Sequence, residues 1–501
     1  MTRPRTHSRI IAVTLSAALA VSPLPAPAQP APCRCPQADV PPAIAPTISP
    51  TLPADVCVPT KLVDNVCAAV APAGGPPFAF FDDFSWRSFV ALVWPALDGQ
   101  RGVADPAAVP GKAGPLVFET FKHDWELFQP NGAAPAAWAS YAGMNPCNNV
   151  TLKYGDLVLA AFSKYTNIAQ TTIGDLAAPL PSQPAAQRPG TPKLPGEYTR
   201  YLTGFNQVEF DQIVNHQWYI RKNQTNVAFA PDGKKNNPLD VKSAWAIVTP
   251  DMNPARYYMR KAYVLDLVSN QCSPRQVALV GLHIVTKTPS RPQWVWSTFM
   301  QVDAIPGTPG ATAPYAYNDG SGKPMPDQNP IPYPYPPLPP DQPFAFNVTQ
   351  LMPTAASTRA TSAAYQQALA KLGSGVWQYY TLVMTQWPIR AFTNDDGSPG
   401  NTFPGTGATT AFANPLLETF DQDDVEFGGC MGCHNVTGGS GSGNTDFLWS
   451  LYLNANPPLV GTNASQPQFH GLNLPLRDPR LVKLKELLQR VRATPAAKPP
   501  Q

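Results

Sequence analysis

The order of polar and apolar residues divides the chain into helical and extended segments. At 82–94, two acidic residues open an apolar and aromatic run that Pro95 ends, which is how a helix starts and stops. Further helices are expected at 118–128, 208–221, 358–372, 377–384, 415–427 and 481–491.

A central region of the chain has a different pattern. Runs rich in β-branched and aromatic residues occupy 241–248, 257–268, 275–287 and 293–303. Pro, Asn, Asp or Ser residues separate these runs, so that consecutive runs can pair across turns. The spacing predicts an antiparallel meander, and the fold class is therefore α+β.

Proline shapes the connections between these elements, since the chain has 62 prolines among 501 residues. Proline lacks the N–H that helices and sheet interiors need, so long proline-rich stretches run as extended or irregular connections. The stretches are 29–75, 180–196 and 304–343, and the first is expected to be a linker or a wrapping arm.

The charge composition excludes one class of partner. Charged residues make up 14% of the chain, the formal net charge is +3, and no dense run of lysine and arginine is present. Nucleic-acid binding needs a concentrated basic surface. We therefore expect no nucleic-acid partner.

The first 28 residues have the pattern of a secretory signal. Arg3, Arg5 and Arg9 precede an apolar run at 10–21, and Ala26-Pro27-Ala28 matches a small-residue cleavage site. The run is too short to span a bilayer, and no Arg-Arg pair precedes it, which favours the Sec route. We expect a periplasmic or secreted protein without a membrane span in its mature part. A retained N-terminal anchor is the alternative.

One motif carries specific chemistry, Cys430-Met431-Gly432-Cys433-His434. In C-x-x-C-H, two thiols form thioether bonds to haem and the adjacent histidine becomes the proximal ligand of the iron. The motif predicts one covalent haem c, held by Cys430 and Cys433 with His434 as the axial ligand. A zinc site would need a second nearby Cys/His pair, and a thioredoxin-like site would need a βαβ unit; the sequence offers neither.

The distal side of this haem is less clearly marked. Met431 lies inside the motif and no methionine follows His434. His283, inside a predicted strand, is a candidate distal ligand, and Met300 and His470 are others. A core role for His283 and a haem with an open distal site are the alternatives.

Six of the eight cysteines lie outside the motif: Cys33, Cys35, Cys57, Cys67, Cys147 and Cys272. An even remainder in an oxidising compartment predicts disulfides, with Cys57–Cys67 as a local pair, although buried thiols are the alternative.

The last hundred residues resemble the haem-attachment region of class I-like monohaem cytochromes c at Cys430, Cys433 and His434. Four further stretches, at 85–95, 281–288, 294–299 and 385–388, carry a second resemblance. Through them, most of the chain resembles a group of bacterial periplasmic "cytochrome c family" proteins with a single C-terminal C-x-x-C-H motif. The resemblance implies haem binding and electron transfer, but it does not identify a substrate.

Together these features predict an antiparallel β-sheet body with flanking helices and long proline-rich loops, plus a small helical haem-binding C-terminal segment. The expected divisions are a signal peptide at 1–28, a linker at 29–75, the body at 76–400 and the haem segment at 401–501. The expected function is single-electron transfer with a redox partner protein or enzyme. A haem-dependent oxidase, dioxygenase or peroxidase whose body forms the distal pocket is the first alternative, and a haem sensor is the second.

Overall fold

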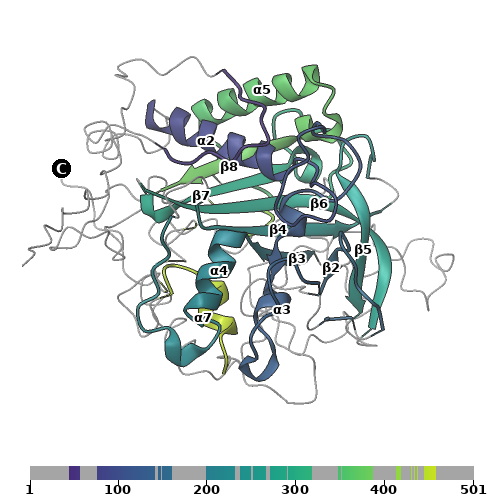
Figure 1. Ribbon diagram of the computed structural model, residues 1–501. Coiled ribbons are helices and arrows are strands. Elements are labelled where there is room, and N and C mark those ends of the chain that lie inside the picture. The colour runs from purple at the N-terminus through teal and green to yellow at the C-terminus, as the bar shows by residue number, and fades with distance from the viewer. Residues whose placement is uncertain are drawn as a thin grey trace, which may run out of the picture.

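The computed structural model describes residues 45–56, 76–141, 145–147, 149–160, 199–231, 237–249, 252–266, 271–289, 291–318, 348–350, 352–387, 413–418, 430, 434, 437 and 445–457. This part of the chain forms one mixed sheet with helices on both faces (Figure 1). The α+β class is therefore confirmed. Several expectations lie outside the described residues: the signal at 1–28, Cys33, Cys35, Cys57, Cys67, Cys433, His470, the loop 180–196 and the helix 481–491.

Within the described residues, the sheet has eight strands. They are β1 (Lys122–His123), β2 (Val158–Leu159), β3 (Arg200–Phe205), β4 (Leu239–Ile247), β5 (Met259–Asp266), β6 (Gln271–Thr288), β7 (Arg291–Gln301) and β8 (Tyr380–Gln386). Their order is β1-β3-β4-β6-β5-β2, and β7 pairs with both β6 and β8. Only the pairing of β2 with β5 is parallel among these strands.

All four predicted strands are present, but the simple meander is wrong. β4 pairs with β6 instead of its neighbour in sequence, β5. The cause is the length of β6, whose 18 residues exceed what any one neighbour covers. β5 pairs with its first half and β7 with its second half, while β4 pairs along its middle. β6 therefore links β5 and β7, which pair with its two halves, to β4, which pairs along its middle.

The α-helices are α2 (Pro76–Leu92), α3 (Asp124–Leu127), α4 (Gln207–Asn215), α5 (Ala356–Lys371) and α7 (Trp449–Asn454). Short 3-10 helices are η1 (Phe118–Thr120), η2 (Pro130–Gly132), η3 (Arg221–Asn223), η4 (Val302–Ala304) and η5 (Gly375–Tyr379). Helices are confirmed within 82–94, 208–221 and 358–372, although α4 ends six residues before Arg221.

Two other helix predictions are wrong, and a third, at 415–427, is tested only at 415–418 because 419–427 lie outside the described residues. The range 118–128 divides into η1, β1 and α3, because β1 pairs with β3 and this pairing overrides local helix preference. Likewise, the range 377–384 lies in η5 and β8, and β8 pairs with β7. Residues 415–417, at the start of the range 415–427, form a turn.

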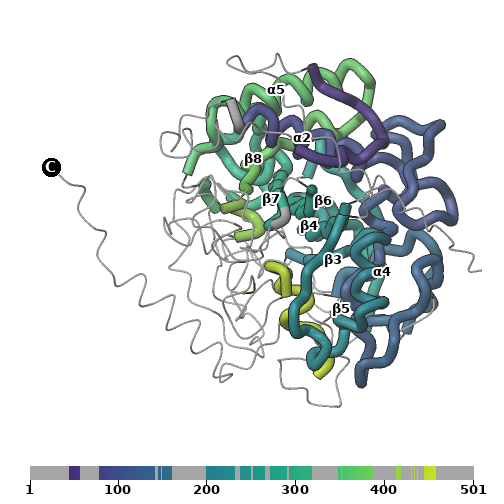
Figure 2. The backbone as a smooth tube through the Cα atoms, turned by 60° about the vertical axis from the view of Figure 1, so that its left-hand side comes forward, coloured from purple at the N-terminus to yellow at the C-terminus, as the bar shows by residue number. Residues whose placement is uncertain are grey.

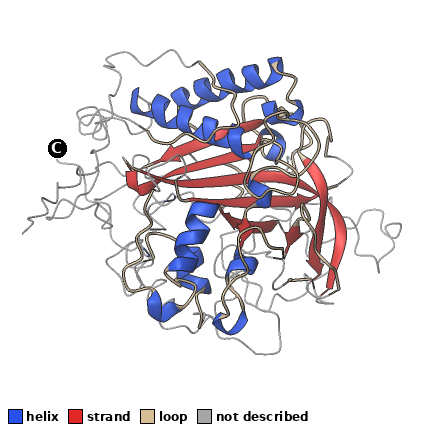
Figure 3. Ribbon diagram, viewed as in Figure 1, coloured by secondary structure: helices blue, strands red, loops and turns tan. Residues whose placement is uncertain are grey.

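Helices cover both faces of the sheet, as Figure 3 shows, and each face is covered by a different set of segments. Because side chains alternate along a strand, Ile284 and Val285 of β6 face opposite ways. Ile284 packs in one core with Trp86 of α2, whereas Val285 packs in another with Phe447 and Leu448. Helices α2 and α5 therefore cover one face, and the described C-terminal residues pack on the other with α4 (Figures 1 and 2).

Two connections tie distant segments to this body. A disulfide joins Cys147 to Cys272 across a sequence separation of 125 residues, which confirms the expectation of disulfide bonding. In the predicted linker, Val56 is buried beside Phe81 and Trp387, so this part of 29–75 packs as an arm. No helix among the described residues is long and apolar enough to cross a membrane.

Candidate functional site

Two residues of the C-x-x-C-H motif lie within the described part of the chain. Cys430 and His434 both have helical backbone and are four residues apart, which places their side chains on one face of a helical turn. Cys430 packs against the apolar cluster that contains Phe210 of α4 and Leu451 of α7. The thiol and the imidazole are thus both held against the sheet body.

The ring of His434 has a defined hydrogen bond. Its Nδ1 lies 2.6 Å from the backbone oxygen of Phe447. A carbonyl oxygen only accepts, so Nδ1 must carry a proton and donate. In the neutral imidazole, Nε2 then holds the lone pair that binds metal ions.

The carbonyl that orients His434 belongs to a constrained loop. Asp446 and Phe447 have φ values of 52° and 72°, in the left-handed region that non-glycine residues rarely adopt. The carbonyl of Thr437 accepts hydrogen bonds from the backbone N–H groups of both Thr445 and Phe447. Thr437 is in turn joined to the motif, since its hydroxyl donates to the His434 carbonyl at 3.0 Å.

Buried polar contacts fix this loop to the sheet. The Asp446 carboxylate forms an ion pair with Lys287 of β6 and accepts from the backbone N–H of Phe229. The indole N–H of Trp294 donates to the Asp446 backbone oxygen at 3.0 Å. A strained backbone persists only where its surroundings over-determine it, and these contacts do so here.

Tryptophan side chains of β7 complete the surroundings of His434. The ring of Trp296 has its centroid 4.3 Å from that of His434, with the two planes tilted by 53°. Trp294 and Trp296 are both buried and belong to the same apolar cluster as Phe447. The imidazole therefore lies between a hydrogen-bonding carbonyl and an indole face.

His283 lies on β6, paired in register with Thr298 of β7. Its Nε2 is 2.6 Å from Oε1 of Glu418, and both side chains are nearly buried. The segment 413–418 that supplies Glu418 is anchored by Asn414, whose side-chain amide donates to Thr298 Oγ1 at 2.7 Å. Ligation of iron through His283 Nε2 would have to replace this contact with Glu418.

The same segment approaches the sheet closely at Gly281. A Cβ atom at this position would lie 2.9 Å from Cδ1 of Leu417. Met300, opposite Gly281 in register, is buried in a cluster with Leu416 and Leu417. These contacts give Met300 a core environment.

A group of buried charged residues lies on the same side of the sheet. Glu209 of α4 and Asp240 of β4 interact electrostatically with each other, and Glu209 also interacts with Asp446 and Lys287. Burial raises the pKa of Glu209 well above its usual value, and the charges of Asp240 and Asp446 raise it further. Burial also raises the pKa of Asp240 to about 7.

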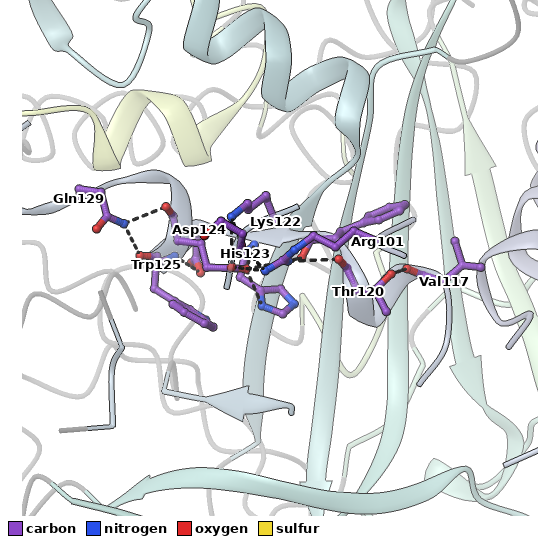
Figure 4. A network of polar contacts seen from close by, with 11 residues as sticks. Arg101, Val117, Thr120, Lys122, His123, Asp124, Trp125 and Gln129 are labelled. Carbon is purple, nitrogen blue, oxygen red and sulfur yellow. Dashed lines mark hydrogen bonds and ion pairs between the residues drawn. The ribbon is translucent and has the colours of Figure 1, made fainter. Parts of the chain in front are cut away.

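A second buried polar network lies on β1 and α3 (Figure 4). The Arg101 guanidinium donates to both carboxylate oxygens of Glu126, and Lys122 donates to the Ser140 carbonyl at 2.7 Å. Burial lowers the pKa of neighbouring His123 to about 4 and keeps its ring neutral. The network fastens the chain around 101–141 to the sheet edge, which is a structural role.

Within the described ranges, no group of three or more His, Cys, Asp and Glu side chains is placed to hold a metal ion. The chain matches no protein-family model, no curated protein and no solved structure. The structure brings His434, Cys430 and Trp296 to one side of the sheet, and His283 lies on a strand paired with that of Trp296. Cys433 lies outside the described residues.

The sequence pattern did not identify the residues that hold the loop beside His434, nor the buried charged residues next to that loop. The loop at Asp446, Lys287 and Glu209 come from separate segments, and only folding brings them together. One signal was present for Glu209. It lies four residues before the buried Ile213 in a short helix, on the face that packs inward.

Proposed function

We propose that this protein is an exported monohaem c-type cytochrome that transfers single electrons to or from a redox partner protein or enzyme. Cys430 and Cys433 would form the thioether bonds, and His434 would be the proximal iron ligand. The protein would lie in the periplasm or be secreted, in keeping with the signal pattern at 1–28.

The hydrogen bond from His434 Nδ1 to the Phe447 oxygen is the observation that carries this proposal. Histidines that bind metals donate their other ring nitrogen to a carbonyl or carboxylate, which fixes the tautomer and raises ligand basicity. The position of Cys430 one helical turn earlier fits the same group, because one face then presents the thiol and the imidazole.

The described residues would each have a defined part. Haem c supplies a one-electron redox centre when it is bound. The Phe447 carbonyl orients the His434 ring, and Trp296 limits its rotation and excludes water from one side. The ion pair of Asp446 with Lys287 holds the loop that presents this carbonyl.

A haem oxidase or peroxidase is the second candidate, and the His283–Glu418 pair favours it. A buried imidazole hydrogen-bonded to a carboxylate is the arrangement that general acid–base catalysis uses. Here the sheet body would supply the distal pocket, and His283 with Glu418 would hold or transfer a proton there.

Optical and EPR spectra of the purified ferric holoprotein test these functions against each other. An electron carrier is expected to be six-coordinate and low-spin, and to bind carbon monoxide or cyanide slowly. A five-coordinate high-spin haem that binds these ligands rapidly would contradict the carrier and support the enzyme. An unchanged spectrum in a folded His283→Ala variant would show that His283 is not the distal ligand.

A further inference from the structure

We propose that Glu209 is a proton-binding site whose occupancy is linked to the oxidation state of the haem, an inference that rests on the proposed function. Glu209 is completely buried on α4, and neither of its carboxylate oxygens has a hydrogen-bond partner among the described residues.

A buried carboxylate without partners is very unfavourable, so Glu209 must be neutral and protonated in the resting fold. The helix does not compensate for it. The side chain of Asn206 caps α4 by accepting from the Glu209 backbone N–H at 3.0 Å, and this hydrogen bond does not involve the Glu209 carboxyl group.

The charged groups that face Glu209 come from three other elements. Asp240 of β4 and Asp446 of the loop before α7 are negative neighbours, and Lys287 of β6 is the positive one. Lys122 of β1 lies 5.7 Å from the ring centroid of Phe210, the next residue on α4. The Lys287 charge is already engaged by Asp446, so little positive charge is left to stabilise a Glu209 carboxylate.

The surroundings of Glu209 favour the binding of a proton over that of a metal ion. The described residues contain no group of three or more His, Cys, Asp and Glu side chains placed to hold a metal ion, and the positive charge of Lys287, which interacts with Glu209, disfavours a second cation there. The group is sealed from solvent, since Glu209 and Asp446 are fully buried and Asp240 is 8% exposed.

The link to the haem runs through Asp446. This residue interacts with Glu209, and the next residue, Phe447, accepts the hydrogen bond from His434. Phe210, beside Glu209, also shares an apolar cluster with Cys430. A positive charge gained at the iron in this low-dielectric interior would favour the Glu209 carboxylate over its protonated form.

The coupled step balances in charge. When one electron leaves the haem for a one-electron acceptor protein, Glu209 loses one proton to solvent and becomes a carboxylate. Reduction by a one-electron donor reverses both transfers. The interior therefore keeps the same net charge in both oxidation states, which is what burial favours.

The test is a spectroelectrochemical titration of the full-chain holoprotein from about pH 6 to about pH 10, a range set by the raised pKa values of buried carboxyl groups. In the wild-type protein, the midpoint potential should fall as pH rises, approaching a tenfold change in the reduction equilibrium per pH unit, about 59 mV. Glu209→Gln, which keeps the shape and removes the proton, should flatten this dependence. Asp211→Asn, on the exposed side of the same helix, should keep it.

Covalent haem content is measured first, so failure of the haem assignment is distinguished from failure of the proton link. With haem present, a flat wild-type profile or an equal slope in Glu209→Gln would overturn the inference. If Glu209→Gln does not fold, Asp240→Asn serves instead, and loss of that negative neighbour should move the sloping region to lower pH. Redox-difference infrared spectra give a second readout, in which a protonated-carboxyl band should disappear on oxidation and be absent from Glu209→Gln.

Discussion

The Asp446–Lys287 ion pair offers the sharpest test of how the loop at 445–447 is held. The side chains are 0% and 4% exposed, respectively. Replacing Asp446 with asparagine keeps the shape and the acceptor for the Phe229 N–H, but leaves the Lys287 ammonium buried without its carboxylate. Breaking a buried pair in this way costs about 3–5 kcal/mol. Typical domains have about 5–15 kcal/mol of stability, so the loss should be easy to measure.

A double-mutant cycle separates the ion pair from packing. Burial raises the pKa of Asp446 despite the opposing effect of Lys287, which indicates that the pair offsets its desolvation incompletely. Replacing both residues should therefore be milder than the single change. We expect Asp446→Asn/Lys287→Met to recover at least about 1 kcal/mol relative to Asp446→Asn alone, because the unpaired charge is gone.

Guanidinium unfolding followed by tryptophan fluorescence measures these differences, and the exposed pair Lys112–Asp105 supplies the control. Lys112→Ala should leave the unfolding midpoint unchanged, because its side chain is 57% exposed. A wild-type unfolding midpoint in Asp446→Asn would contradict this role of the ion pair, and so would a double variant whose destabilisation equals the sum of the two single changes.

Three further predictions concern other parts of the body. Burial raises the pKa of Asp82 from 3.8 to about 7, so the folded chain binds this proton more tightly than the unfolded chain, and stability should fall as pH rises through that window. Asp82→Asn should reduce this slope in unfolding titrations, and an unchanged slope would contradict the assignment. Replacing Cys147 and Cys272 with alanine should lower the free energy of unfolding by about 2–5 kcal/mol in chemical denaturation, whereas an unchanged value would show that the 125-residue separation closed by the bond is not stabilising. Gly281→Val should destabilise by about 1–3 kcal/mol by displacing Leu417, and a wild-type melting temperature would argue against the close approach.

The strands were the most predictable part of the fold. Each of the four central runs is rich in β-branched and aromatic residues, and β4 to β7 begin and end within a few residues of them. Their pairing was not predictable in the same way. Pairing depends on which strand is long enough to take several neighbours, and among the described strands β6, with 18 residues, is the longest.

Helices were predictable where local pattern and tertiary contacts agree. α2 and α5 both contribute residues to the core that covers one face of the sheet, including Trp86 of α2 and Tyr365 and Leu369 of α5. The range 118–128 has an equally helical sequence, but β1 pairs with β3 and its residue Lys122 enters a buried network. Such pairing with a distant strand leaves no trace in the local pattern.

The residues of the candidate site also differ in how well the sequence predicts them. Cys430 and His434 belong to a short motif whose spacing carries its chemistry, so the sequence alone predicts them. Phe447, Lys287 and Glu209 act through contacts between residues far apart in the chain. Their importance follows only from the fold.

Covalent haem attachment is the central claim, and acid–acetone extraction of the purified full chain tests it most directly. The protein should be expressed with export and haem-attachment machinery, and its haem quantified before and after extraction. We predict one haem per chain that resists extraction in the wild-type protein and in the Cys147→Ala/Cys272→Ala control, and an extractable or absent haem when Cys430 and Cys433 are both replaced with alanine. A wild-type chain that retains no haem after extraction would contradict the account.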